Sequence, residues 1–349
     1  MDERVPSITV IIAARPDLAE VKAVAASRAL EYPPEKLEIL VARGKQPSVQ
    51  RNAAMKAARG TWIYFLDDDS VPPPENLRLV LPLLGRPEVQ MIGGPNVCPP
   101  EAPALEQVFA LVLASWLAFG PSRARYTPVG AMRESSEKEL ILCNLMARRE
   151  SMLALGGFNE ALYPNEENAL MDELQKRGGK LIYEPRFLVH RRPRASLRSF
   201  ARMLRTYGRG RAEQFRLHPT AGSALNFVPP LFCVYLVLEA VWLVFGGAGW
   251  NGTAKQIGLL GLLPLGAYAV AVLGQSAALV FGGGTMAEGR AGLGVGILRA
   301  LAASPLIVLS HLLYGFGFWR GLFTTLKPPE SRAPVPVALE TVKPLGGPA

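Results

Sequence analysis

The sequence predicts an α/β domain with a mostly parallel sheet, followed by a C-terminal helical membrane domain. Up to about residue 220, short apolar runs typical of buried strands alternate with helical segments, as in βαβ units. Beyond it, three apolar stretches are each long enough to cross a hydrocarbon core of about 30 Å. The chain has 349 residues, which is enough for two such parts.

The strands of the α/β domain, expected over residues 1–194, are recognised as continuous apolar runs. The helices between them are marked by their end signals. Ser48 is a good N-cap and Gly60 a good stop, and Pro72-Pro73-Pro74 opens another helix. We expect strands at 8–14, 37–42, 61–66, 89–94, 139–147, 180–184 and 186–190, with helices at about 18–30, 48–59, after 74, and up to Arg177.

The segment 104–119 is apolar around most of a helix but too short to span a bilayer comfortably. A buried core helix and a helix at the membrane surface both remain open.

The membrane domain is expected at 224–322, with segments at 225–246, 256–281 and 297–319. Arg299 and Pro305 interrupt the third segment, so we expect it to be irregular or re-entrant. The tail 323–349 is Pro-rich and predicted to be disordered.

The charge and the cysteine content limit the partners and the kinds of site to be expected. The net charge is +9, and nine arginines opposed by Glu213 fall between Arg191 and Arg216. We predict a basic juxtamembrane helix at 195–223 that is attracted to anionic membrane lipid and is cytoplasmic by the positive-inside rule. Aromatic side chains are sparse in it, which argues against nucleic acid. The three cysteines are far apart, which argues against a disulfide framework or a zinc site.

The N-terminal sequence does not have the pattern of a signal peptide. The protein is therefore expected in the inner cell membrane, as a multi-pass protein with its α/β domain in the cytoplasm.

Asp67-Asp68-Asp69 follows an apolar strand directly. Three adjacent carboxylates need a counter-charge, and Mg²⁺ or Mn²⁺ is the obvious one. Magnesium sites usually add substrate phosphates to one or two carboxylates, so a metal–nucleotide substrate is indicated. A phosphohydrolase of the haloacid-dehalogenase type, with Asp67 as nucleophile, and a merely solvated acidic turn are the alternatives. The two βα units that precede the run favour the nucleotide site.

Several motifs in order resemble the family 2 glycosyltransferases, which have the GT-A fold. Arg51-Asn52-Ala53-Ala54 with Ala58-Arg59-Gly60 resembles a family helix, and Asp67-Asp68-Asp69 its Asp-x-Asp. Gly156-Gly157-Phe158-Asn159-Glu160 matches "GGF-(D/N)-E", and Glu166-Glu167 its acidic pair. The resemblance covers about residues 5–216. The membrane segments add a similarity to members of exopolysaccharide or cell-envelope glycan synthesis.

The resemblance implies an inverting transfer of a sugar from a nucleotide-sugar donor to a membrane-associated acceptor, such as a polyprenyl-linked one. Glu167 stands at the general base, where the family usually has Asp. The metal would be held by Asp67, Asp69 and His190. Donor contacts are implied for the following positions: Ala14, Arg15, Asp17, Arg51, Asp67 and Asp68, with Arg209 and Arg211 near the diphosphate.

One position departs from the family. After the second strand the relatives usually carry Asp-Asp-Gly-Ser, whose first Asp contacts uracil, but this chain reads Ala42-Arg43-Gly44-Lys45. The donor base is therefore open, and Arg43 and Lys45 favour phosphates. A non-catalytic lipid-binding module with a degenerate transferase fold is a further alternative.

Overall fold

The computed structural model describes residues 5–160, 166–217, 219, 221–245, 252–281, 293–326 and 336–347. It divides into two compact units. The first comprises 1–102, 121–192 and 327–349, and the second 103–120 and 193–326. The boundary after Arg192 lies close to the expected one, but residues 103–120 join the helical unit.

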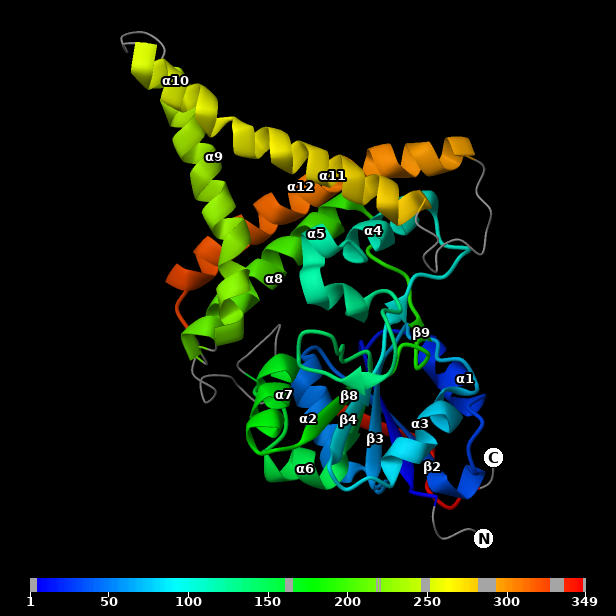
Figure 1. The fold of residues 1–349 in the computed structure, drawn as a ribbon. Coiled ribbons are helices and arrows are strands. Elements are labelled where there is room, and N and C mark those ends of the chain that lie inside the picture. The colour runs from blue at the N-terminus through cyan, green and yellow to red at the C-terminus, as the bar shows by residue number, and fades with distance from the viewer. Residues whose placement is uncertain are drawn as a thin grey trace. The chain divides into compact units, whose positions relative to one another are not determined.

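The first unit is built on a mixed eight-stranded sheet (Figure 1). Its order is β10-β2-β1-β3-β7-β4-β8-β6, and β5 pairs with β9 in a separate ribbon. The strands are β1 Ile8–Ala14, β2 Leu37–Arg43, β3 Trp62–Asp67, β4 Val89–Gly93, β5 Asn96–Val97, β6 Arg133–Glu134, β7 Asn144–Arg148, β8 Lys180–Tyr183, β9 Val189–His190 and β10 Ala338–Lys343. The α/β class is confirmed, but the sheet is mixed rather than mostly parallel, because β6, β7 and β10 each pair antiparallel with their neighbours.

Strand direction in this sheet changes at β7. β1 is parallel to both β2 and β3, and β4 is parallel to β8. β7 runs antiparallel between β3 and β4. The helices of this unit are α1 Lys22–Arg28, α2 Pro47–Ala57, α3 Asn76–Leu84, α6 Arg149–Ala154 and α7 Glu166–Lys176.

Apart from Thr9 and the terminal Asp67, the central strands β1 and β3 are apolar, because both faces of the sheet are covered. Ile12 and Tyr64 point into a core that includes residues of α1 and α3, and Ile11 and Phe65 into one that includes α2 and α7. Ala13 is paired with Asp67 in the β1–β3 register. The carboxyl ends of both strands therefore lie at one edge of the sheet.

The C-terminal segment corrects one expectation. Residues 338–343 were predicted to be disordered, but they form β10, antiparallel to β2. Lys343 Nζ donates to the Pro34 carbonyl over 2.7 Å, and Arg43 Nε lies 3.3 Å from Glu340 Oε2. The edge of β2 supplies the backbone partners that a Pro-rich composition conceals. Residues 327–335 of the predicted tail lie outside the described residues.

The second unit is helical. Its helices are α4 Ala104–Leu113, α5 Trp116–Phe119, α8 Leu197–Leu217, α9 Val228–Phe245, α10 Gly252–Gly261, α11 Leu263–Phe281 and α12 Leu293–Phe323. Short 3-10 turns lie at Pro34–Lys36, Gly120–Arg125 and Ala221–Phe227.

Among the described residues, three helices are long and apolar enough to cross a membrane. They are Ala224–Phe245, Gly258–Leu279 and Gly294–Phe323, and the α4–α5 pair, bent by 60°, passes the same test as one broken segment. α12 continues without a break through Arg299 and Pro305, so the expected irregularity there is wrong. Residues 246–251 and 282–292 lie outside the described residues.

The segment 104–119 packs within the helical unit. Phe109 of α4 stacks on Phe200 of α8 with ring centroids 4.3 Å apart. This segment is therefore not a core helix of the α/β unit.

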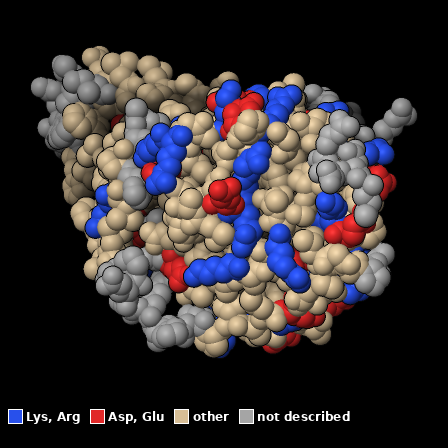
Figure 2. Space-filling model, turned by 90° about the horizontal axis from the view of Figure 1, so that it is seen from below, with Lys and Arg blue, Asp and Glu red and all other residues tan. Residues whose placement is uncertain are grey.

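Positive charge is not confined to the arginine-rich helix α8. On the face shown in Figure 2, a band of Lys and Arg side chains crosses the surface with Asp and Glu side chains beside it. Opposite charges interspersed in this way give no large field of one sign on this face.

Candidate functional site

The acidic run lies at the carboxyl edge of the sheet, where open α/β folds bind their ligands. Asp67 is the last residue of β3, and Asp68 and Asp69 lie in the turn that follows. The Asp67 N–H and the Ser70 hydroxyl are 3.3 Å apart, and that hydroxyl donates to the Cys143 carbonyl over 3.2 Å. The turn is thereby fixed at the end of the strand.

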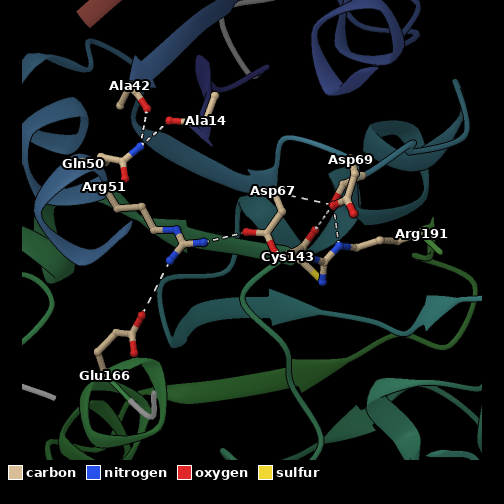
Figure 3. A network of polar contacts seen from close by, with 10 residues as sticks. Ala14, Ala42, Gln50, Arg51, Asp67, Asp69, Cys143, Glu166 and Arg191 are labelled. Atoms are coloured by element: carbon tan, nitrogen blue, oxygen red, sulfur yellow. Dashed lines mark hydrogen bonds and ion pairs between the residues drawn. The ribbon is translucent and has the colours of Figure 1, made fainter. Parts of the chain in front are cut away.

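Arg51 connects two acidic groups that lie far apart in the sequence. It is buried one turn into α2, which begins with a proline at Pro47. Its Nη2 lies 2.6 Å from Asp67 Oδ1, and its Nη1 lies 3.6 Å from Glu166 Oε1 (Figure 3). Asp67 and the first residue of α7 are therefore parts of one charge network.

Arg191 approaches Asp67 and Asp69 from the other side (Figure 3). Its Nη2 lies 3.2 Å from Asp67 Oδ2, and its Nε lies 2.5 Å from Asp69 Oδ1. A backbone bridge holds it there, because Val71 and His190 exchange two N–H···O bonds of 2.9 Å. Arg51 and Arg191 thus supply counter-charge to Asp67 and Asp69, in addition to any cation that binds.

Burial makes two acids of the site harder to ionise. Desolvation raises the pKa of Asp68, with Asp69 and Asp67 adding to it, while Arg15 and Arg191 oppose the shift. Desolvation and then the Glu167 carboxylate raise the pKa of Glu166 to about 8. Arg51 lowers this pKa, but at 3.6 Å it does not offset the burial.

The Arg191 guanidinium, in contrast to the two acids, keeps its charge at this site. Burial disfavours the charged form of Arg191, but Asp67, Cys143 and Asp69 keep its pKa well above the usual value. Arg191 is therefore a permanent positive charge at this edge of the sheet.

Asn52 fixes the Gly-Gly-Phe-Asn-Glu segment. Its Oδ1 accepts from the Phe158 N–H over 2.9 Å, and its Nδ2 donates to the Phe158 carbonyl and to Glu160 Oε1, each over 2.9 Å. Gly157 adopts φ +80°, and a Cβ there would lie 2.5 Å from Asn52 Oδ1. Glycine is required at this position for backbone conformation and for space.

The start of α7 is held on both sides of Glu167. Glu166 is buried and faces Arg51, and Asn168 is buried and accepts from Arg125 Nη2 over 2.5 Å. Glu167 between them is half-buried. Its backbone position is thus fixed by neighbours that do not use its carboxylate. Pro164 and Asn165, which precede the acidic pair, lie outside the described residues.

The end of β2, where the chain departs from the family, is occupied by its own side chains. Gln50 Nε2 donates to the carbonyls of Ala14 and Ala42 over 2.8 and 2.6 Å (Figure 3). Arg43 Nη1 donates to the Leu18 carbonyl over 2.8 Å, in addition to its contact with Glu340. Arg43, expected to favour phosphates, is thus engaged at the sheet edge.

The remaining residues predicted to bind the donor lie as follows. The Ala14 carbonyl, at the end of β1, accepts from Gln50 and from the Gly44 N–H. Arg15 is exposed, with its Nε 3.8 Å from Asp68 Oδ2, and Asp17 is exposed. Arg15 and Asp68 are therefore brought together, while Asp17 lies at the surface beyond β1.

His190 stands at the end of β9 with a buried Nδ1 that has no hydrogen-bond partner. Within the described part of the chain, no group of three or more His, Cys, Asp or Glu side chains is placed to hold a metal ion. The three predicted ligands Asp67, Asp69 and His190 are thus not assembled as one set. Asp67 and Asp69 are the residues that could hold a cation. Both already form ion pairs with one positive group, Arg191.

Arg209 and Arg211 belong to α8 in the second unit. Arg209 Nε lies 3.4 Å from Glu213 Oε1, and Arg211 Nη1 donates to Gln214 Oε1 over 3.1 Å. Their contact with a diphosphate stays a prediction.

Two residues at this edge of the sheet are not predicted from the sequence. Arg191 falls there among the membrane-proximal arginines, and nothing marks Gln50. The signal for Arg191 was available, because it directly follows His190 at a strand end and three adjacent acids need counter-charge. Gln50 carried no comparable signal.

The comparisons with known proteins agree with these motifs. A family model described as glycosyltransferase like family 2 matches residues 2–209. The succinoglycan biosynthesis protein ExoA of Rhizobium meliloti (strain 1021) is 28% identical over 217 residues, which is 62% of this chain and 56% of that protein. The match thus spans little more than half the length of this relative.

Two solved structures are similar at low identity. The mannosyltransferase PcManGT from Pyrobaculum calidifontis, in complex with GDP-Man and Mn²⁺, has 16% identity and a TM-score of 0.49, over 88% of this chain and 86% of that one. TarS 1-349 of S. aureus has 10% identity and a TM-score of 0.41, over 90% of both chains.

The family model covers more than half of the chain, and the residues that carry its motifs meet at one edge of the sheet. This excludes the phosphohydrolase interpretation of Asp67. The chain belongs to glycosyltransferase family 2 and has the GT-A fold in its first unit.

Proposed function

We propose that this protein transfers a sugar from a nucleotide-sugar donor to a membrane-associated acceptor, with inversion at the sugar C1. The observation that carries the proposal is the contact of Arg51 with both Asp67 and Glu166. It links the Asp-x-Asp turn, where a donor diphosphate is expected, to the start of α7, where a base is expected. Both are needed for a single displacement at C1.

Glu167 is the proposed general base. Its carboxylate would take the proton of the acceptor hydroxyl as the bond to C1 forms. Glu166 is unsuited to this part because it is buried against Arg51. Glu166 instead orients the first turn of α7, so that the half-buried Glu167 is the carboxylate available to a substrate.

The donor would lie against the edge formed by β1 and β3. Ala14 is the last residue of β1, and Arg15 and Asp17 follow it. Asp67 is the last residue of β3, and Asp68 follows it. Arg51 and Arg191 orient Asp67 and supply counter-charge to it. Arg209 and Arg211 are proposed as diphosphate contacts because the guanidinium fork matches phosphate oxygens.

Mg²⁺ or Mn²⁺ is the proposed cofactor, held by Asp67 and Asp69. Two carboxylates plus substrate phosphates are a usual donor set for such ions. The cation would neutralise the departing diphosphate.

The acceptor is proposed to be lipid-linked, because apolar helices continue the chain beyond the α/β unit. The arginines of α8 would bind anionic lipid headgroups, and the positive-inside rule then puts the α/β unit in the cytoplasm, at the inner membrane. Exopolysaccharide or envelope glycan synthesis is the process proposed.

The test uses the purified full-length protein and a panel of nucleotide sugars, each with and without Mn²⁺ or Mg²⁺. A donor that binds should raise the melting temperature by mass action, and only with the metal present. Asp69→Asn should remove this shift.

Transfer is then measured with the donor so identified and a lipid extract as acceptor. Glu167→Gln should keep the donor-induced shift and lose transfer by about 10²-fold or more. Glu173→Gln, on the exposed side of the same helix, is the matched control. Near-normal transfer in Glu167→Gln would remove the base assignment, and no metal-dependent donor binding at all would favour a non-catalytic module.

A further inference from the structure

The pairing of β10 with β2 constrains how the chain crosses a membrane. Residues 338–343 and 37–43 share backbone hydrogen bonds in one sheet. A sheet cannot form across a bilayer, so both strands lie in the same aqueous compartment. Since the strands up to His190 belong to the same unit, the chain between Arg192 and Ala338 crosses the membrane an even number of times.

The same reasoning applies to the α4–α5 segment. β4 before it and β7 after it are paired strands. The bent pair therefore cannot be a single complete crossing, although it is apolar enough. Three candidate helices remain, Ala224–Phe245, Gly258–Leu279 and Gly294–Phe323, and three is an odd number.

The contacts of α12 identify it as the helix that does not cross. Its last three turns lie directly against α8: a Cβ at Gly208 would meet the Tyr314 carbonyl at 2.0 Å, and one at Gly317 would meet the Arg205 carbonyl at 2.2 Å. Arg216 Nη1 donates to the Gly321 carbonyl over 3.1 Å and also to the Thr324 carbonyl. The small residues thus let the two helices touch backbone to backbone.

α8 cannot enter the hydrocarbon core. It carries six arginines, of which Arg198, Arg202, Arg205 and Arg216 are exposed. A charge at the bilayer centre is costly, whereas at the interface each arginine can reach headgroups. A helix in backbone contact with α8 over three turns lies at the same depth.

The other end of α12 is also tied to a polar group. Arg299 donates to Gln107 Oε1 of α4, whose Phe109 stacks on Phe200 of α8. α12 is 31 residues long, about 46 Å, which exceeds the hydrocarbon thickness. It is therefore attached near both ends to helices that lie at the surface.

α9 and α11 behave differently. α9 leaves α12 at its start, where Trp319 Nε1 donates to the Pro230 carbonyl over 3.0 Å, and reaches α10 at Trp242. α11 returns to α12, where Tyr268 and His311 share a hydrogen bond of 2.7 Å and Ser304 donates to Ser276 over 3.0 Å. In Figure 1 these helices and α12 form three sides of a triangle, with α10 at the corner away from α12.

We propose that α8 and α12 together form a surface that lies in the membrane interface, with anionic headgroups as its partner, and that only α9 and α10–α11 cross, as a hairpin. The α/β unit and the C-terminus are then on one side of the membrane and the start of α10 on the other. This goes beyond the proposed transfer reaction and does not depend on it.

The topology is tested in the full-length protein by cysteine labelling with a membrane-impermeant maleimide. In intact cells with a permeabilised outer envelope, Gln256→Cys at the start of α10 should be labelled as strongly as after lysis. Thr325→Cys, which is exposed just after α12, should be labelled only after lysis. Labelling of Thr325→Cys in intact cells means three crossings and overturns the proposal. Absence of labelling of Gln256→Cys in intact cells overturns the hairpin.

The premise is tested separately by the pair Arg43→Cys and Ala338→Cys, which are register partners on β2 and β10. In membranes treated with a mild oxidant the double variant should form a disulfide and either single variant should not. Failure of the disulfide removes the parity argument. Neither experiment measures transfer, so a failed transferase assay and a failed topology remain distinguishable.

The headgroup contact is tested by flotation with vesicles. The full chain in detergent should bind nanodiscs or vesicles containing anionic lipid more tightly than Arg198→Gln/Arg202→Gln/Arg205→Gln does, with a difference that disappears at high salt. Equal binding at low salt contradicts the headgroup assignment.

Discussion

The guanidinium of Arg51 donates to the carboxylate of Asp67 over 2.6 Å, from a helix to the end of a neighbouring strand. Because Arg51 is buried and its other nitrogen faces the buried Glu166, removing it leaves two acids with less counter-charge. The stability of the site and its chemistry therefore depend on the same side chain.

Arg51→Met should destabilise the protein by about 2–3 kcal/mol, because the hydrogen bond to the Asp67 carboxylate is lost and the buried Glu166 is left facing an apolar side chain. Arg78→Met is the matched control. Arg78 lies 3.6 Å from Glu31, the same separation as Arg51 from Glu166, but both partners are exposed. Arg78→Met should lower the free energy of unfolding by less than about 1 kcal/mol. Equal shifts in the melting temperature of the two variants would contradict the assignment.

Arg191→Met should raise the affinity of the protein for Mn²⁺ in the absence of donor, by roughly ten-fold. The guanidinium of Arg191 contacts Asp67 and Asp69, so a cation held by the same carboxylates is repelled by it or must displace it. Titration followed by the Mn²⁺ electron paramagnetic resonance signal measures this directly. The Arg78→Met variant should bind as the wild type does, and weaker Mn²⁺ binding in Arg191→Met would refute the competition.

Because burial raises the pKa of Glu166, the stability that this residue contributes should fall as pH rises. Its folded pKa of about 8 lies above the ordinary value of 4.5, so between these values the folded state holds one more proton than the unfolded state. Stability contributed by this group is therefore present at low pH and is lost as pH rises through that window. Glu166→Gln mimics the protonated side chain and does not titrate.

The measurement is the difference in melting temperature between Glu166→Gln and the wild type from pH 5 to pH 9. It should rise in favour of the variant up to about pH 8 and then level off. A difference that is flat or falls with pH would show that Arg51 outweighs burial at this carboxyl.

Gly157→Ala should be more destabilising than Gly156→Ala. Both glycines have positive φ, +80° and +79°, so alanine is strained at each by about 1 kcal/mol or more. At Gly156 nothing lies within 4 Å of the added Cβ, whereas at Gly157 it meets Asn52. Thermal unfolding of the two variants isolates the Asn52 contact, and equal losses would show that backbone strain alone governs the segment.

The parts of the fold that could be predicted from the sequence are those with a local signal. β1 and β3 are uninterrupted apolar runs, and the acids at the end of β3 mark the edge where the site lies. The direction of β7 had no such signal, because an apolar strand reads the same whether its neighbours are parallel or antiparallel. Its placement between β3 and β4 depends on long-range pairing.

The counter-charges of the site are likewise a tertiary property. Arg51 is 16 residues from Asp67, and Arg191 is 122 residues from Asp69. The Arg-rich segment that begins at Arg191 looked uniform in sequence, but its first member belongs to the α/β unit and later ones to α8. Charge and spacing alone do not separate them.

The strand β10 also matters for how this protein can be handled. Without it, β2 would present a row of unpaired N–H and C=O groups at the rim of the sheet, and such rims recruit strands from other chains. A form shortened after α12 should therefore precipitate or self-associate even if every active-site residue is intact. An affinity tag is better attached ahead of β1, which has a strand on each side. Beyond Lys343 it would be attached directly to β10, the strand that covers the edge of β2.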